Sequence, residues 1–191
     1  MRTAGLATMV YYYFDFRDVK KQDRYGLLSS LVFQLSAELD SCYKVFSQLY
    51  SDHANGTRKP TTIALTKCLK DMLNLPEQGP IYIIVDALDE CPDVSGNPST
   101  CEDVLELIQE LVSLKLSNLR LCVASRSEVG IRETLEPLRP LQISLQDESG
   151  QKDDIIEYIK FVVHSDKKMR SWKDEDKDLV VEMLSEKAEG T

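Results

Sequence analysis

The sequence predicts an α/β fold, a three-layer sandwich with a mostly parallel sheet between helices, followed by a helical subdomain. Two observations predict the sheet: short apolar runs rich in β-branched and aromatic residues are separated by amphipathic stretches, and one run has no polar alternation. A third observation predicts the subdomain, because the apolar spacing becomes helical near residue 150 and no strand follows. We therefore expect an α/β domain over residues 1–148 and the start of a helical subdomain over residues 149–191.

Four apolar runs are the predicted strands of the sheet. Residues 9–16 (MVYYYFDF) are dense in β-branched and aromatic residues, which favour strands. Residues 81–85 (IYIIV) form an apolar run without alternation, which is typical of a parallel strand covered on both faces. Residues 119–124 and 141–145 have a similar apolar character and complete the predicted sheet.

The segments between these runs carry apolar residues at the three- and four-residue spacing of amphipathic helices. A first helix is predicted over residues 25–50, and a second begins at Thr61 or Thr62, either of which can cap it. Further helices are predicted over residues 102–116, 131–135, 155–163 and 179–184. Loops rich in turn-forming residues are predicted at 51–60 and 91–100.

The charge balance and the cysteine pattern argue against several classes of protein. There are 23 Lys and Arg residues against 32 Asp and Glu, and the net charge of −9 argues against a general nucleic-acid binder. No apolar run approaches the length of a membrane span, and the first residues lack the apolar core of a signal peptide. The five cysteines form no C-x-x-C pair, which argues against a disulfide framework and a zinc cluster. We expect a cytoplasmic protein with reduced thiols and with neither a membrane nor a nucleic acid as partner.

The segment IYIIVDALDE carries the candidate site. Asp86 directly follows a predicted parallel strand, at the edge of the sheet where α/β proteins bind ligands, and its carboxylate can hold a hydrated Mg²⁺ ion. Asp89 and Glu90 lie just beyond it and are candidates to orient or deprotonate a water that attacks a γ-phosphate. The alternative is a buried strand that ends in helix-capping carboxylates, and the residues alone leave both interpretations open.

Arg126 is the second candidate for the same site. It follows the next predicted strand, in the segment LCVASR, and is therefore expected at the same edge of the sheet as Asp86. A guanidinium at that place can bind the terminal phosphate of a nucleotide and report whether it is present. The alternative is an ordinary exposed arginine at the end of a strand.

Two segments taken together resemble a known family. IYIIVDALDECP and LRLCVASRSE resemble the Walker B and sensor-1 segments of NACHT-type signal-transduction ATPases, which are P-loop NTPases of the STAND class. The nearest likeness is to the fungal group with a nephrocystin-like N-terminal domain, and the segments YYYFDFRDVKKQD and LLSSLVFQLS share it.

This resemblance implies a P-loop NTPase fold, ATP and Mg²⁺ as cofactors, and a conformational switch coupled to nucleotide binding and hydrolysis. It also implies roles for the candidate residues. Asp86 takes the magnesium-linked Walker B position, Asp89 and Glu90 take the catalytic acidic pair that follows it, and Arg126 takes the nucleotide-binding sensor-1 position.

The chain departs from that family at the phosphate-binding loop. The family's G-x-x-x-x-G-K-[ST] loop is expected before the strand at residues 9–16, but none of the eight glycines is followed by lysine. We therefore expect a partial module, without the first strand of the family's sheet, that binds nucleotide weakly or not at all and is inactive alone. The alternative is a non-catalytic interaction or regulatory module that keeps the fold. In both cases we expect protein partners or self-association.

Overall fold

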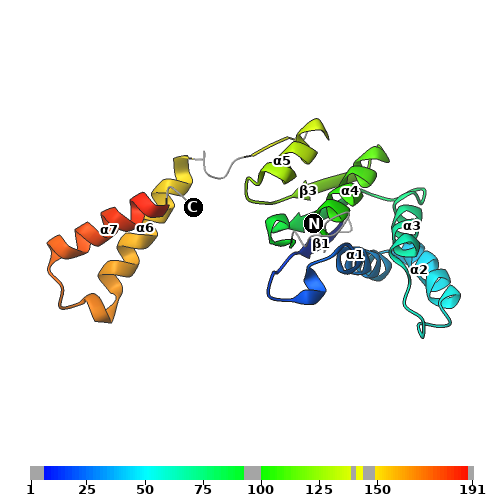
Figure 1. Cartoon of the computed structure of the whole chain (residues 1–191), viewed down its shortest axis with the longest axis horizontal. Helices are drawn as coiled ribbons and strands as arrows, with labels where there is room; N and C mark the ends of the chain where they lie inside the picture. The colour runs from blue at the N-terminus through cyan, green and yellow to red at the C-terminus, as the bar shows by residue number, and fades with distance from the viewer. Residues whose placement is uncertain (1–6, 93–99, 139–140, 144–148, 189–191) are drawn as a thin grey trace. The chain divides into compact units, whose positions relative to one another are not determined.

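The computed structural model describes residues 7–92, 100–138, 141–143 and 149–188. The chain divides into two compact units, Met1–Pro140 and Leu141–Thr191 (Figure 1). The first unit is an α/β domain that contains a three-stranded parallel sheet, and the second is helical where it is described. The α/β class that the apolar runs predict is therefore confirmed.

The sheet consists of β1 (Thr8–Tyr13), β2 (Ile81–Asp86) and β3 (Leu119–Val123), in the spatial order β1-β2-β3. All the pairings are parallel, and their register places Thr8 beside Ile81 and Ile81 beside Leu119. Three of the four predicted strands are thus present. Because they are parallel, all three end at one edge of the sheet, where the chain continues into the loops that carry the candidate residues.

The fourth predicted strand, over residues 141–145, is wrong for its first three residues. Residues 141–143 belong to no strand, and the side chains of Leu141 and Ile143 are 92% and 68% exposed. Residues 144 and 145 lie outside the described residues. A strand needs a hydrogen-bonded neighbour and a surface against which to bury its apolar face, and a short apolar run supplies neither by itself.

Seven α-helices are present in the described parts of the chain, five in the first unit and two in the second. They are α1 (Arg24–Glu38), α2 (Asp40–Asp52), α3 (Thr62–Leu73), α4 (Thr100–Ser113), α5 (Val129–Leu135), α6 (Ser149–Ser165) and α7 (Asp174–Ala188). Single turns of 3₁₀-helix are η2 (Val19–Lys21), η3 (Leu88–Glu90), η4 (Glu136–Leu138) and η6 (Lys167–Met169).

Two predicted helix boundaries are decided by local backbone geometry. The single helix predicted over residues 25–50 is broken, because Leu39 is extended (φ −130°, ψ 117°) and separates α1 from α2. At the start of α3, the cap is Thr61 rather than Thr62, since the Thr61 side chain accepts a hydrogen bond from the N–H of Ala64 at 3.2 Å.

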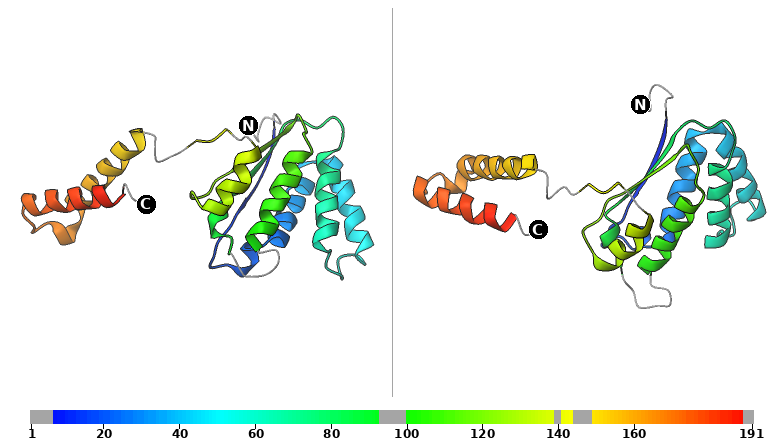
Figure 2. Two further views of the ribbon diagram at one scale, coloured as in Figure 1. Left: turned by 45° about the horizontal axis from the view of Figure 1, so that its top comes forward. Right: turned by 90° about the horizontal axis from the view of Figure 1, so that it is seen from above.

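One face of the sheet is buried against helices, and the other is open in the described part of the chain. Val10, Ile83 and Val85 are at most 1% exposed and belong to the core, whereas Tyr11 and Tyr82 on the opposite face are 46% and 39% exposed. The strand order explains this difference. Crossovers between parallel strands are right-handed, so successive crossovers that add strands in the same direction place their helices on the same face. Figure 2 shows α1 and α4 on the same side of the sheet. The prediction that residues 81–85 are covered on both faces is therefore not met by the described residues.

In the second unit, α6 and α7 pack against each other. Val163 of α6 and Val181 of α7 are 2% and 8% exposed and are the buried side chains of this unit among the described residues. No helix among the described residues has the length and apolar character needed to cross a membrane.

Candidate functional site

The candidate site begins where β2 ends, at Asp86. Its carboxylate is exposed, and the Oδ1 atom accepts a hydrogen bond from the N–H of Ala87 at 2.8 Å. Ala87 has a left-handed backbone conformation (φ 53°), which is uncommon for a residue with a Cβ atom and turns the chain sharply away from the strand. The next residue, Leu88, is fully buried and anchors η3, which carries Asp89 and Glu90.

Asp89 and Arg126 are brought into direct contact, although 37 positions separate them in the sequence. The Oδ1 atom of Asp89 accepts the N–H of Arg126 at 3.0 Å, and its Oδ2 atom lies 3.4 Å from the Nε atom of the same arginine. The Asp89 side chain is 13% exposed, whereas that of Arg126 is 79% exposed. Asp89 therefore fixes the loop after β3 through the backbone and leaves most of the guanidinium in solvent.

Glu90 joins the same edge to the loop that follows β1. Its Oε2 atom accepts a hydrogen bond from the N–H of Phe16 at 3.2 Å. Nearby, the Sγ atom of Cys91 donates to the carbonyl oxygen of Gln22 at 3.3 Å, and the Gln22 side chain in turn donates to the carbonyl of Phe16. The loop after β1 is therefore tied to the segment that carries Asp89 and Glu90.

The sequence predicts that these residues meet at one edge, and the structure brings Asp89 and Arg126 together and places Asp86 and Glu90 beside them in the same segment. The part played by Phe16 and Gln22 is not visible in the residue pattern, because Phe16 contributes only backbone groups and Gln22 contributes a carbonyl as well as its side-chain amide. A general signal exists, since the loops that follow adjacent parallel strands share an edge of the sheet. We call the set Asp86, Asp89, Glu90 and Arg126 the rim.

The rim offers limited capacity for a metal ion. Across the described residues, no group of three or more His, Cys, Asp or Glu side chains could enclose a metal ion. A bound Mg²⁺ ion does not require three protein ligands, because it keeps several waters and binds through one or two carboxylates together with substrate phosphates. The exposed carboxylate of Asp86 fits this pattern, and its Oδ2 atom makes no hydrogen bond to another described residue.

Comparison with known proteins gives one family. The family model described as nephrocystin 3, N-terminal, matches residues 1–126. The chain belongs to this family. The match includes all four rim residues, and it confirms the resemblance to proteins with a nephrocystin-like N-terminal domain. No curated protein matches the chain, and no solved structure matches it either.

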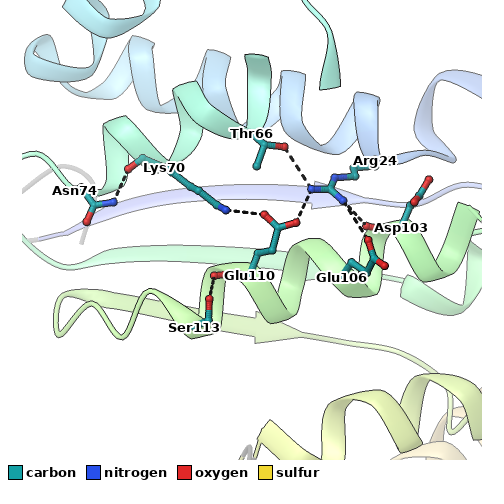
Figure 3. A network of polar contacts seen from close by, with 8 residues as sticks. All are labelled: Arg24, Thr66, Lys70, Asn74, Asp103, Glu106, Glu110 and Ser113. Carbon is teal, nitrogen blue, oxygen red and sulfur yellow. Dashed lines mark hydrogen bonds and ion pairs between the residues drawn. The ribbon is translucent and has the colours of Figure 1, made fainter. Parts of the chain in front are cut away.

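A second polar cluster lies within the matched nephrocystin 3 N-terminal region, in the helical layer (Figure 3). Glu110 of α4 accepts hydrogen bonds from the Nη2 atom of Arg24 at 2.9 Å and from the Nζ atom of Lys70 at 2.6 Å. Arg24 also donates to the hydroxyl of Thr66 and to the carbonyl of Asp103. We call Arg24, Lys70 and Glu110 the helix triad, because it joins α1, α3 and α4.

The triad is partly buried, and its two cations share a single carboxylate. Burial alone would raise the pKa of Glu110, but the hydrogen bonds from Lys70 and Arg24 outweigh it and lower the pKa below its usual value. Arg24 and Glu110 also line a groove of about 750 Å³ between the start of α1, α3 and α4. No rim residue lines this groove, so the two polar clusters are separate features of the domain. No sequence motif marks Arg24, Lys70 or Glu110.

Proposed function

We propose that this chain is part of the nucleotide-binding module of a NACHT-class signalling NTPase and that the rim is the magnesium and sensor half of its site. The observation that supports this most directly is the placement of the rim. Acidic side chains after β2 and an arginine after β3 lie at the carboxyl edge of a parallel sheet, where open α/β folds bind ligands. Both strands fall within the region matched by the family model.

Each rim residue has a role in this proposal. Asp86, exposed at the end of β2, would hold Mg²⁺ through one carboxylate oxygen, and the ion would neutralise charge on the phosphates of ATP. Arg126, whose guanidinium is largely in solvent, would bind the terminal phosphate. Asp89 and Glu90 would order the loops on either side and would be the acidic groups nearest to an attacking water.

The parallel strand order β1-β2-β3 supports the proposal that this sheet is of the P-loop NTPase type. The phosphate-binding loop of that fold, however, is not found in the sequence. The 191 residues contain no glycine followed by lysine, so the β- and γ-phosphates have no lysine of a phosphate loop. We therefore expect the chain to bind Mg·ATP with a Kd of about 1 mM or weaker and to show no turnover.

A specific observation favours a second function, that of a non-catalytic interaction module. Asp89 and Glu90 each accept a backbone N–H from a neighbouring loop, at 3.0 Å and 3.2 Å, which is a structural use of a carboxylate. A domain that kept these contacts for folding alone would retain the rim without binding a nucleotide.

Backbone NMR spectra of the full chain distinguish the two functions. With about 10 mM Mg·ATP, the amide signals of Ala87, Asp89 and Arg126 should shift, and Asp86→Asn should abolish the magnesium-dependent part of the shift. The matched control is Asp154→Asn, an equally conservative change at an exposed position of α6. If the rim amides do not shift, the nucleotide proposal fails and the interaction module is favoured.

A further inference from the structure

The loop that follows β1 starts at the same edge of the sheet as the rim. On its outer side, β1 is held by Gln34 of α1, whose side-chain amide accepts the N–H of Tyr11 at 3.1 Å and donates to the carbonyl of Tyr11 at 2.6 Å. On its inner side, the N–H of Phe14 donates to the carbonyl of Asp86 at 3.1 Å. The chain therefore leaves β1 directly beside Asp86, from a strand that is held on both sides.

This loop carries an aspartate and an arginine that repeat the contact between Asp89 and Arg126. The Oδ1 atom of Asp15 accepts the backbone N–H of Arg17 at 2.9 Å and the Nε–H of the same side chain at 2.9 Å. Its Oδ2 atom accepts from Nη2 at 3.1 Å, which completes a two-point contact with the guanidinium. The Asp15 side chain is 20% exposed and that of Arg17 is 75% exposed. Each arginine is thus oriented by a largely covered aspartate that also fixes its backbone.

Glu90 of the rim and the ring of Phe16 further define the position of Arg17. Glu90 accepts the N–H of Phe16, the residue directly before Arg17, and the Arg17 guanidinium lies 5.7 Å from the centroid of the Phe16 ring. Hydrogen bonding to Asp15 raises the pKa of Arg17, and the charge of Glu90 acts in the same direction. The Nη1 atom of Arg17 makes no hydrogen bond to any described residue, so it can meet a ligand while Asp15 holds Nε and Nη2.

We propose that Arg17 is a second phosphate-binding residue of the site and contacts the terminal phosphate of a nucleoside triphosphate from the β1 side, while Arg126 contacts it from the β3 side. This inference rests on the proposed nucleotide-binding function. β2 lies between β1 and β3, so the two arginines follow strands that are roughly 10 Å apart and have Asp86 between them. Two arginine side chains can converge across that distance, because the oxygens of one phosphate accept hydrogen bonds from more than one guanidinium.

The charges at this edge favour a phosphate that brings Mg²⁺ with it. With Asp15 and Arg17 added to the rim, the edge carries four carboxylates and two guanidiniums, which leaves an excess of two negative charges. One Mg²⁺ ion would balance this excess, whereas a phosphate without a metal would be repelled by it. Contact between Arg17 and a phosphate should therefore require Mg²⁺.

The first test compares Arg17→Gln with Arg170→Gln, which loses the same charge at an exposed position of the second unit. Titrations followed at the amide of Ala87 measure the binding of Mg·ATP and of Mg·ADP, which lacks the terminal phosphate. Arg17→Gln should weaken Mg·ATP binding about three- to tenfold and change Mg·ADP binding by less than about twofold. Equal binding of Mg·ATP by the two variants, or an equal loss for the two nucleotides in Arg17→Gln, would overturn the inference.

The second test needs no substitution, because the Nε–H group of Arg17 gives its own NMR signal. This signal should shift with Mg·ATP and stay in place with Mg·ADP or with Mg²⁺ alone. If the amides of Ala87 and Asp89 shift with Mg·ATP but the Arg17 signal does not, the nucleotide proposal stands and the inference about Arg17 is wrong. If none of these signals shifts, the proposed function fails and the inference fails with it.

Discussion

At the rim, Asp89 and Glu90 accept backbone N–H groups from the loops after β3 and β1, whereas in the helix triad Glu110 accepts hydrogen bonds from the side chains of Arg24 and Lys70. The two clusters differ in which charged groups remain exposed to solvent. In the triad, two cations share one carboxylate, so both oxygens of Glu110 are occupied, while the Nε atom of Arg24 is buried without a hydrogen-bond partner among the described residues. The rim leaves the Asp86 carboxylate and most of the Arg126 guanidinium in solvent. The triad is therefore suited to holding helices together, and the rim to meeting a ligand.

The largest effect that separates the two clusters is expected from Glu110→Ala. Arg24 is 16% exposed, and without Glu110 its guanidinium and the Lys70 ammonium lose their shared partner. We expect a loss of about 1–3 kcal/mol in the free energy of unfolding, measured by denaturant titration. Glu106→Ala is the control, because Glu106 is 60% exposed and lies 3.8 Å from Arg24. Equal losses in the two variants would mean that the triad is no more stabilising than a surface pair.

A smaller effect is expected at the rim, from a pair of substitutions at Asp89. Asp89→Ala removes the acceptor for the N–H of Arg126 and should cost about 1 kcal/mol. Asp89→Asn keeps an acceptor oxygen and removes the ion pair, and because Arg126 is 79% exposed this should cost at most about 0.5 kcal/mol. Chemical denaturation of both variants measures the difference. If Asp89→Asn were the more destabilising variant, the charge rather than the backbone contact would hold the loop.

The smallest effect expected is a pH dependence that is specific to the triad. The pKa of Glu110 is lowered in the folded chain from its ordinary value of 4.5, so the folded state binds this proton less readily than the unfolded chain does. The resulting stability is complete above the unfolded pKa and is lost as the pH falls through the folded pKa. The Tm difference between the wild type and Glu110→Gln should therefore be larger at neutral pH than at about pH 3. A difference that did not change with pH would contradict this assignment.

How much the sequence predicts depends on whether a feature is local. The strands β1, β2 and β3 are visible as apolar runs, and the meeting of Asp89 with Arg126 follows from the rule that parallel strands end at one edge. The break at Leu39 is not visible, because leucine is a good helix former and only its extended backbone ends α1.

Long-range packing accounts for what the sequence does not reveal. The contact between Arg24 and Glu110 spans 86 positions and depends on how α1 and α4 are placed in the helical layer. The apolar run at residues 141–145 is the reverse case, a feature that is predicted but not formed. Its composition favours a strand, but residues 141–143 are exposed and belong to no strand. The roles proposed for Asp86 and Arg126 in nucleotide binding remain predictions, which the NMR spectra recorded with Mg·ATP test.

The side-chain amide of Gln34, from α1, lies across the centre of the outer edge of β1. The backbone groups of Met9, Tyr11 and Tyr13 face this edge, and Gln34 engages both groups of Tyr11. An incoming strand would need those two groups, because a strand edge is recognised through its unpaired N–H and C=O groups. Gln34→Ala would therefore expose the middle of the edge and make the chain more prone to edge-to-edge aggregation, which light scattering would measure.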